Sequence, residues 1–146
     1  MDSQRQASLR YAIVIAAVLA LAPGRRRPRL LLWLVPVVPP LVVLSGNGVH
    51  TAATLRSELA CPATVALTAA VPLAAGLALL RGTALDGVRA MALGLCAAAT
   101  GLFALHWHCT DGSAPHLLGF HLLPWLALGL LAIPLRRALP TRSHVP

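Results

Sequence analysis

The chain has 146 residues, of which 58% are hydrophobic and only 11% are charged, and its mean hydropathy is +0.76. A water-soluble domain of this size cannot bury so much apolar surface, so the composition predicts an all-α integral membrane protein. The net charge is +8, but aromatic residues make up only 4% of the chain, whereas a surface that binds nucleic acid combines basic with aromatic side chains. We therefore expect membrane lipid around the protein and no direct contact with nucleic acid, and we interpret the positive charge as a signal of membrane topology.

Five apolar segments indicate a single transmembrane domain that comprises residues 1–146. Their expected bounds are approximately 9–23, 30–45, 62–80, 88–107 and 116–135. The first contains an apolar stretch of only about 12 residues, or roughly 18 Å of helix, which is short for a bilayer span. We therefore expect a polytopic bundle of about five transmembrane helices, or four if the first segment is interfacial. A secretory signal peptide has a similar composition, but Pro23 directly after the apolar run disfavours that alternative.

Proline and capping residues indicate where individual helices begin or bend. Pro36, Pro39 and Pro40 are expected to kink or loosen the second segment, because proline removes a backbone donor and clashes with the preceding turn. Pro62 suits the first turn of the third helix. Asp86 follows a threonine at the spacing of a capping box and predicts the start of the fourth helix.

Small residues in the fourth segment recur at a spacing of four. Gly94 with Ala98, and Ala97 with Gly101, would let a neighbouring helix approach closely. Such spacing also arises by chance in an alanine-rich helix, so the pattern by itself does not identify the contact.

The distribution of arginine predicts the orientation of the helices. With five spans, nine of the twelve arginines fall on one side of the membrane and three on the other. The nine are Arg25, Arg26, Arg27, Arg29, Arg81, Arg89, Arg136, Arg137 and Arg142. The positive-inside rule places these residues, and the C-terminus with them, in the cytoplasm. If the first segment is interfacial, the N-terminus moves to the cytoplasm and the remaining topology is unchanged.

This topology brings Cys61 and Cys109 to the outward ends of adjacent helices, in an oxidising compartment. A disulfide bond between them would close a loop of about 48 residues and stabilise the hairpin by on the order of 4 kcal/mol in the chain-entropy model. The alternative is two unpaired thiols at helix ends, because topology does not determine the Cα separation. Cys96 lies in the middle of its span and is expected to be a small buried residue.

Histidine and cysteine gather in the stretch "ALHWHCTDGSAPHLLGFHLLPW". Candidate ligands for zinc or copper are His108, Cys109, His116 and His121, with His106 as a substitute. Their spacing matches no defined zinc motif, and His116 and His121, five residues apart, diverge on an α-helix. An interfacial belt of amphipathic side chains therefore explains the stretch better than a metal site does. His121 is nevertheless expected to face the bundle, because polar groups within a span usually do.

Four motifs together resemble the NrsF family, the negative regulators of sigma F. They are "ELACP", "LHWHC", "APHLLGFHLLPW" and "PLRRALP", and the resemblance covers about residues 58–139. It implies a multi-pass protein of the bacterial inner membrane that holds a cytoplasmic sigma factor and releases it when an envelope signal arrives. The N-terminus departs from the pattern, because only "MDSQRQASLR" precedes the first apolar run, where the family usually has a cytoplasmic polar segment.

The sequence therefore predicts a membrane-bound negative regulator, similar to an anti-sigma factor, that senses an envelope redox or metal signal through the outward Cys/His cluster. The alternative is a small transporter or binding protein for a thiophilic metal ion, which would require Cys or His within a span to relay the ion. We do not expect an enzyme, because the four acidic residues are scattered and the chain has no G-x-S-x-G, H-E-x-x-H or phosphate-binding glycine loop.

Reporter fusions test the predicted orientation. A reporter fused after Arg142 is expected to be active only in the cytoplasm, and one inserted near Gly112 only outside, because arginine-rich loops stay on the cytoplasmic side. The activities of two reporters with opposite compartment requirements measure both positions. Opposite signals would show that the orientation is reversed and that the stretch rich in histidine and cysteine faces the cytoplasm.

Overall fold

The structure of the protein is a computed structural model that describes residues 35–45, 48–49, 55–83 and 86–140. The expected first span, residues 9–23, lies outside these residues, as does the beginning of the second. The side chains of residues 106–108 are also outside the described part.

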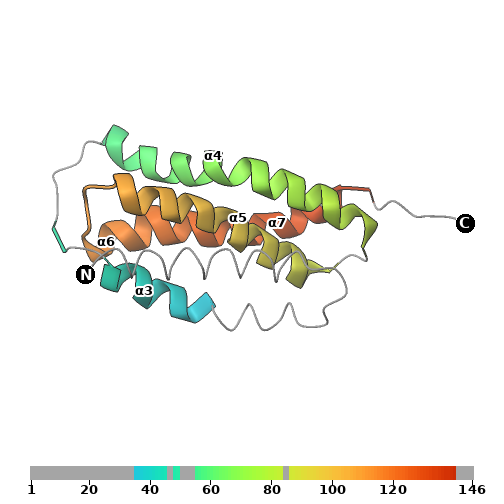
Figure 1. The fold of residues 1–146 in the computed structure, drawn as a ribbon, viewed down its shortest axis with the longest axis horizontal. Coiled ribbons are helices and arrows are strands. Elements are labelled where there is room, and N and C mark those ends of the chain that lie inside the picture. Colours follow the sequence, from blue (N-terminus) through green and yellow to red (C-terminus); the bar gives the residue numbers. More distant parts are fainter. Residues whose placement is uncertain (1–34, 46–47, 50–54, 84–85, 141–146) are drawn as a thin grey trace, which may run out of the picture.

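All regular structure in the described residues is helical, which confirms the all-α prediction (Figure 1). The elements are η1 (Val35–Val37), α3 (Val38–Ser45), α4 (Leu55–Leu79), η2 (Leu80–Gly82), α5 (Gly87–His108), α6 (Ala114–His116), η3 (Leu117–Leu122) and α7 (Leu123–Ala138). Of these, η1 and η2 are 3₁₀-helices, and η3 is a π-helix that joins α6 to α7 without a break.

Three helical stretches are long and apolar enough to cross a membrane. They are Glu58–Gly82, Gly87–Leu105 and Ala114–Ala138, and they coincide with the predicted third, fourth and fifth spans. A shorter apolar helix, Val35–Leu44, overlaps the predicted second span. Membrane-spanning helices are therefore plausible for this chain, and the total of five spans stays a prediction.

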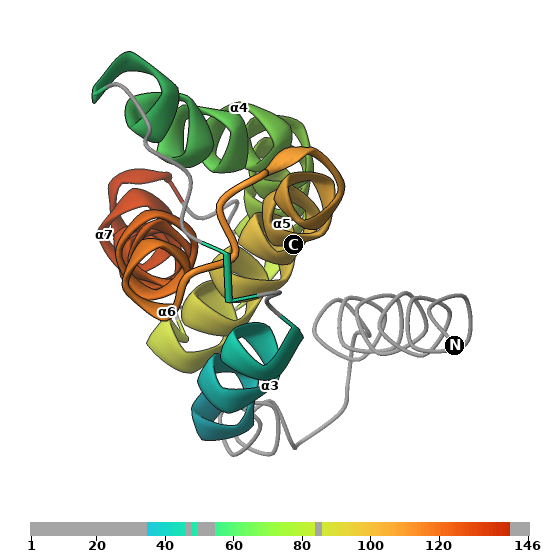
Figure 2. The same ribbon diagram turned by 90° about the vertical axis from the view of Figure 1, so that its left-hand side faces the viewer.

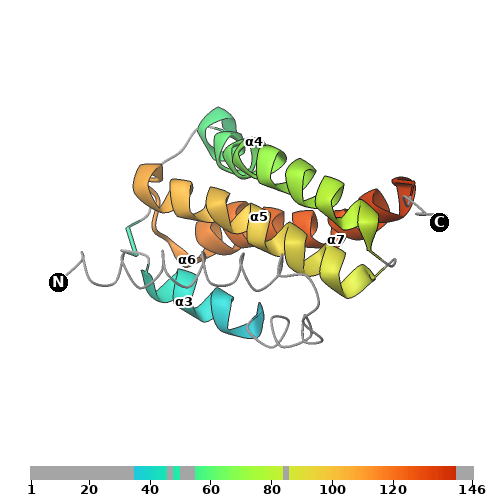
Figure 3. The same cartoon turned by 45° about the vertical axis from the view of Figure 1, so that its right-hand side comes forward.

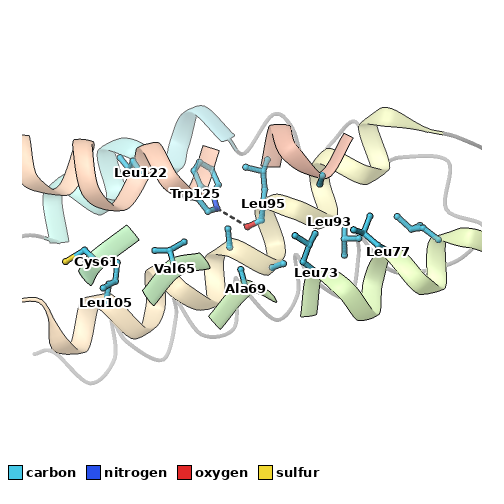
Figure 4. Close-up of a cluster of buried hydrophobic side chains, with 14 residues drawn as sticks. Cys61, Val65, Ala69, Leu73, Leu77, Leu93, Leu95, Leu105, Leu122 and Trp125 are labelled. Atoms are coloured by element: carbon cyan, nitrogen blue, oxygen red, sulfur yellow. Dashed lines mark hydrogen bonds between the residues drawn. The ribbon is translucent and has the colours of Figure 1, made fainter. Parts of the chain in front are cut away.

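The three long helices form a bundle in which α5 contacts both α4 and α7 along its length (Figure 2). α3 lies on the side of the bundle away from α4 and contacts η3 (Figure 3). The core is built mainly from Leu, Ala and Val side chains of these helices, together with the buried Trp125. The Trp125 indole donates a hydrogen bond of 2.9 Å to the Leu95 carbonyl, which ties α7 to α5 in the middle of the bundle (Figure 4).

Glycine permits the close approach of α5 to both neighbours. A Cβ atom on Gly94 would lie 2.6 Å from the Leu128 carbonyl oxygen and 2.9 Å from the Gly129 Cα of α7. A Cβ atom on Gly101 would lie 2.6 Å from the Val65 Cα of α4. The pattern of small residues therefore reflects two real helix contacts, one with each neighbour of α5.

The prolines lie in different places from those predicted. Pro62 is inside α4 and does not begin it, because the helix-forming segment "LRSELA" extends the helix upstream and the proline interrupts only the hydrogen bond to the Glu58 carbonyl. Pro39 and Pro40 lie in the first turn of α3, where a missing N–H costs little, so in the described residues they begin a helix instead of kinking one.

The end of the bundle formed by η2, the start of α5 and the end of α7 carries Arg81, Arg89, Arg136 and Arg137. Asp86 is the N-cap of α5 and its Oδ1 accepts from the Val88 N–H at 2.9 Å, which confirms the predicted helix start. Thr83 does not complete a capping box, since its hydroxyl donates to the Leu80 carbonyl. Arg136 is buried, and its Nη2 donates to the carbonyls of Leu80 at 2.9 Å and Thr83 at 3.0 Å. The guanidinium thus caps the C-terminal end of the α4–η2 helix.

A substitution at Gly94 tests the close contact between α5 and α7. Gly94→Ala places a methyl group against backbone atoms of α7, so the helices must move apart, and we expect a loss of stability of about 1–3 kcal/mol. The thermal midpoint of the detergent-solubilised protein measures this loss. Gly82→Ala is the matched control, because a Cβ atom there meets nothing within 4 Å. Equal midpoints for the two variants would contradict the close contact.

Candidate functional site

Four soft metal-ligand side chains converge at the end of the bundle opposite Arg136. Cys61 is near the beginning of α4, Cys109 is the C-cap of α5, His116 is the last residue of α6 and His121 is in η3. Their Sγ and ring nitrogen donor atoms all lie within 4.8 Å of one another. Cys109 is half-buried and the other three side chains are buried. We call these four residues the Cys/His cluster.

His116 lies between the two cysteines. Its Nε2 atom is 3.3 Å from the Cys109 Sγ and 3.7 Å from the Cys61 Sγ. The two sulfurs are 3.9 Å apart, so they are in contact but not bonded, because a disulfide requires about 2.05 Å. The structure therefore places the predicted pair together in the thiol state, and their bonding stays a prediction.

The π-helix explains how two histidines five residues apart reach one site. On an α-helix they would diverge, as the sequence suggested, but a π-helix forms i→i+5 hydrogen bonds and places such residues on the same side. The His116 and His121 ring centroids are accordingly 5.3 Å apart in an edge-to-face arrangement. The expectation that these residues diverge was therefore wrong. The expectation that His121 faces the bundle is confirmed, since its side chain is only 2% exposed.

Two residues of the sequence favour a π-turn at this position. Pro124, at the beginning of α7, has no N–H to offer to the carbonyl four residues before it, so a regular α-helix is disfavoured there. Gly119 is exposed in the middle of η3, and its high backbone freedom weakens the preference for α-helix. π-turns inside α-helices occur frequently at functional sites, and this one contributes a buried histidine to the cluster.

The loop between α5 and α6 holds Cys109 and His116 in place. The Asp111 side chain is buried, and its Oδ1 accepts from the Ser113 N–H at 2.9 Å, just before α6 begins. Gly112 exchanges backbone hydrogen bonds with the segment before α4, donating to Val49 at 3.0 Å and accepting from Gly48 at 3.1 Å. Gly48 has a φ of +70°, a conformation that favours glycine. No periodicity in the sequence indicates this pairing of two distant loops.

The remaining sequence-predicted residues are not part of the described cluster. The side chains of His106 and His108 lie outside the described residues, so their ligand role stays a prediction. Cys96 is half-buried within α5 and does not belong to the cluster. Cys61 was predicted only as a redox partner and not as a ligand. The signal that could have assigned it is the topology, which places it at the same end as Cys109.

The donor set, and the spacing of three of its four members, suit a tetrahedral thiophilic ion. For zinc, Zn–S bonds of about 2.3 Å and Zn–N bonds of about 2.0–2.1 Å give tetrahedron edges of about 3.8 Å between sulfurs and about 3.6 Å between sulfur and nitrogen. The three printed separations among Cys61, Cys109 and His116 run from 3.3 to 3.9 Å. Two sulfurs and two imidazoles are also ligands that Cu(I) accepts. The same two sulfurs could instead form a disulfide, so the cluster can support metal or redox chemistry.

The three apolar helices, with soft ligands at one end and arginines at the other, define a small helical protein that has one polar cluster per end and whose long helices could cross a membrane. Residues 6–139 match the model of the NrsF family, which is described as negative regulator of sigma F. The chain belongs to this family. The match begins well before residue 58, so it extends further toward the N-terminus than the four motifs indicated.

The chain is similar to carotenogenesis protein CarR of Myxococcus xanthus, with 29% identity over 128 residues. This match covers 87% of the chain but 57% of CarR, so the chain spans little more than half the length of this relative. No solved structure matches the chain.

Thiol labelling tests whether Cys61 and Cys109 form a redox pair. Mild oxidation of the native protein, followed by maleimide labelling in denaturant because Cys61 is buried, is expected to protect both thiols at the same time, since the sulfurs are already in contact. Reduction should restore the reactivity of both. Replacing either residue by Ser should leave its partner reactive under the same oxidation, as measured by the mass of the labelled protein. Cys96→Ser is the control and should not change the labelling of the pair. Independent oxidation of the two thiols would contradict a bond between them.

Proposed function

We propose that this protein is a membrane-bound negative regulator of a sigma factor, and that the Cys/His cluster senses a thiophilic metal ion or a redox signal outside the membrane. Family membership supports the regulatory role, since the family is described as negative regulator of sigma F. The convergence of four soft donor atoms within 4.8 Å carries the sensing role.

The polarity of the bundle supports this assignment. The Cys/His cluster is at one end of the long helices, whereas Arg81, Arg89, Arg136 and Arg137 are at the other. Under the positive-inside rule, the arginine end faces the cytoplasm and the cluster faces outward. In a bacterial inner membrane, this arrangement would place the cluster on the envelope side and direct the opposite end, with the C-terminus, toward a cytoplasmic sigma factor.

Each of the two signals changes the same set of atoms. A bound ion would draw the sulfurs and imidazoles around one centre and displace the protons of the thiols. Oxidation would join the two sulfurs, release two protons and transfer two electrons to an external oxidant such as another disulfide. Both events would alter the relative positions of α4, α5 and the continuous helical rod formed by α6, η3 and α7, because the four residues come from these elements.

A transporter of thiophilic ions receives less support from the described residues. The four clustered donors lie at one end of the bundle, whereas transport requires further ligands along the path through the membrane. Cys96 lies within α5 but is not grouped with other donor side chains in the described part of the chain. We therefore favour regulation over transport as the function of this protein.

A reporter assay in the native host tests the proposal. Promoters activated by deletion of the gene are identified first, and one of them drives a reporter in cells that carry the full chain. We expect repression by the wild type and release by added zinc, copper or the thiol oxidant diamide. His116→Ala and Cys109→Ser should raise the metal dose that gives half-release at least about tenfold. Loss of a residue that only hydrogen-bonds to a ligand already weakens metal binding by about that factor, and loss of a ligand itself should weaken it at least as much.

Two controls separate sensing from folding and from transport. Cys96→Ser should respond like the wild type, because this residue is outside the cluster. Metal accumulation in the cells should not depend on the protein if it is a regulator. Deletion that activates no sigma-dependent promoter would refute the regulatory role, and cluster variants with a normal response would refute the sensing role.

A further inference from the structure

The π-helix η3 separates two sets of contacts that constrain the same helical rod. The rod runs continuously from Ala114 to Ala138, and η3 is its only non-α part. A π-turn corresponds to one extra residue inserted into an α-helix. It therefore sets the rotation of α7 about the helix axis relative to α6.

Upstream of η3, the rod is held by the Cys/His cluster and the neighbouring loop. His116 contacts both cysteine sulfurs and stacks on Phe120, with ring centroids 5.0 Å apart. The preceding loop is hydrogen-bonded to Gly48 and Val49 through Gly112. This part of the rod is therefore attached to α4, to α5 and to the segment before α4.

Downstream of η3, one face of α7 is buried against the bundle. Its buried residues are Trp125, Gly129, Ala132 and Arg136, whose spacings of four, three and four define a single helix face. Trp125 donates to the Leu95 carbonyl, and Arg136 donates to the carbonyls of Leu80 and Thr83. The second half of the rod is thus oriented by contacts that extend to the arginine end.

Both sets of contacts are satisfied together only when η3 is π-helical. If the same residues formed a regular α-helix, α7 would turn by about 100° and shift by about 1.5 Å relative to His116. The rod would then have to give up either the placement of His121 in the cluster or the buried face of α7. A change of register in which the upstream part stays attached to α4, α5 and the segment before α4 must therefore turn α7 and break the hydrogen bonds of Trp125 and Arg136.

We infer that the register of η3 couples occupancy of the Cys/His cluster to the arginine end of the bundle. This inference rests on the proposed sensing function. An ion held by all four donors favours the π-register, because His116 and His121 face the same centre only in that register. In the α-register, Arg136 leaves the carbonyls of Leu80 and Thr83, and the surface formed by η2 and the end of α7 changes.

A one-residue deletion distinguishes register coupling from simple ligand binding. Deleting Gly119 converts the π-turn into an α-turn while His116 and His121 become four residues apart, so they still share a face. The buried face of α7 also keeps its orientation. The deletion variant should therefore bind the ion but lose the register change, because it has no extra residue to redistribute.

The measurement is a distance across the arginine end in the full chain, reconstituted in lipid nanodiscs. Ketone-bearing amino acids at the exposed positions Gly82 and Arg137 take spin labels without involving the cysteines, and pulsed electron resonance gives the distance distribution with and without zinc. We expect zinc to narrow and shift the wild-type distribution. The Gly119 deletion should bind zinc, measured by competition with a chromogenic chelator, without any shift.

A second variant keeps the test decisive if the deletion impairs folding. Pro124→Ala restores the N–H that a regular α-helix requires, so the zinc-free distribution should move further from the zinc-bound one. An identical zinc-dependent shift in wild type and deletion variant would overturn the inference, as would zinc binding by the wild type without a shift. In those cases the sensing function would remain. Failure of the wild type to bind zinc would instead refute metal sensing, and the inference with it.

Discussion

The contact of α5 with both of its neighbours through glycine is the constraint on which the rest of the structure depends. Gly101 lets α5 approach the backbone of α4, and Gly94 lets it approach that of α7. In lipid, apolar side chains gain little from leaving one apolar surface for another, so close packing has to provide much of the attraction between helices. Because the axes are close, the start of α4, the end of α5 and the rod that contains α7 meet at one end. The Cys/His cluster is a consequence of that proximity.

The two ends of the bundle hold different kinds of polar groups. At one end, soft donors face one another around a common centre, a geometry that a small ion or a new covalent bond can change. At the other end, a permanent cation is enclosed by backbone carbonyls, whose partial negative charge marks the end of a helix. A change at the first end alters which atoms are bonded, whereas a change at the second alters only where a charge is located. The molecule therefore has one end whose donor atoms can bind an ion or one another and another end that holds a fixed charge, joined by an apolar core.

The sequence predicted those features that depend on hydrophobicity or on local chemistry. The three long helices, the Asp86 cap, the shared end of Cys61 and Cys109, and the inward orientation of His121 all follow from such rules. The start of α4 was placed too late, because a proline that commonly begins helices can also lie inside one when the preceding residues favour helix. Cys109, His116 and His121 were named as candidate ligands, but an interfacial belt was preferred and Cys61 was assigned only as a redox partner. Formation of the cluster depends on a π-turn and on the pairing of Gly112 with Gly48 and Val49, and neither leaves a periodic signal.

The buried guanidinium of Arg136 also has a consequence for the order in which the protein assembles. Its carbonyl partners belong to Leu80 and Thr83, which the ribosome produces more than 50 residues earlier. An arginine enclosed without partners is costly in an apolar environment, so α7 can settle only after the end of the α4–η2 helix has formed. The last long helix thus completes the fold by recognising an acceptor pair that already exists. A chain in which the first hairpin is misplaced would leave this buried cation without its carbonyl acceptors.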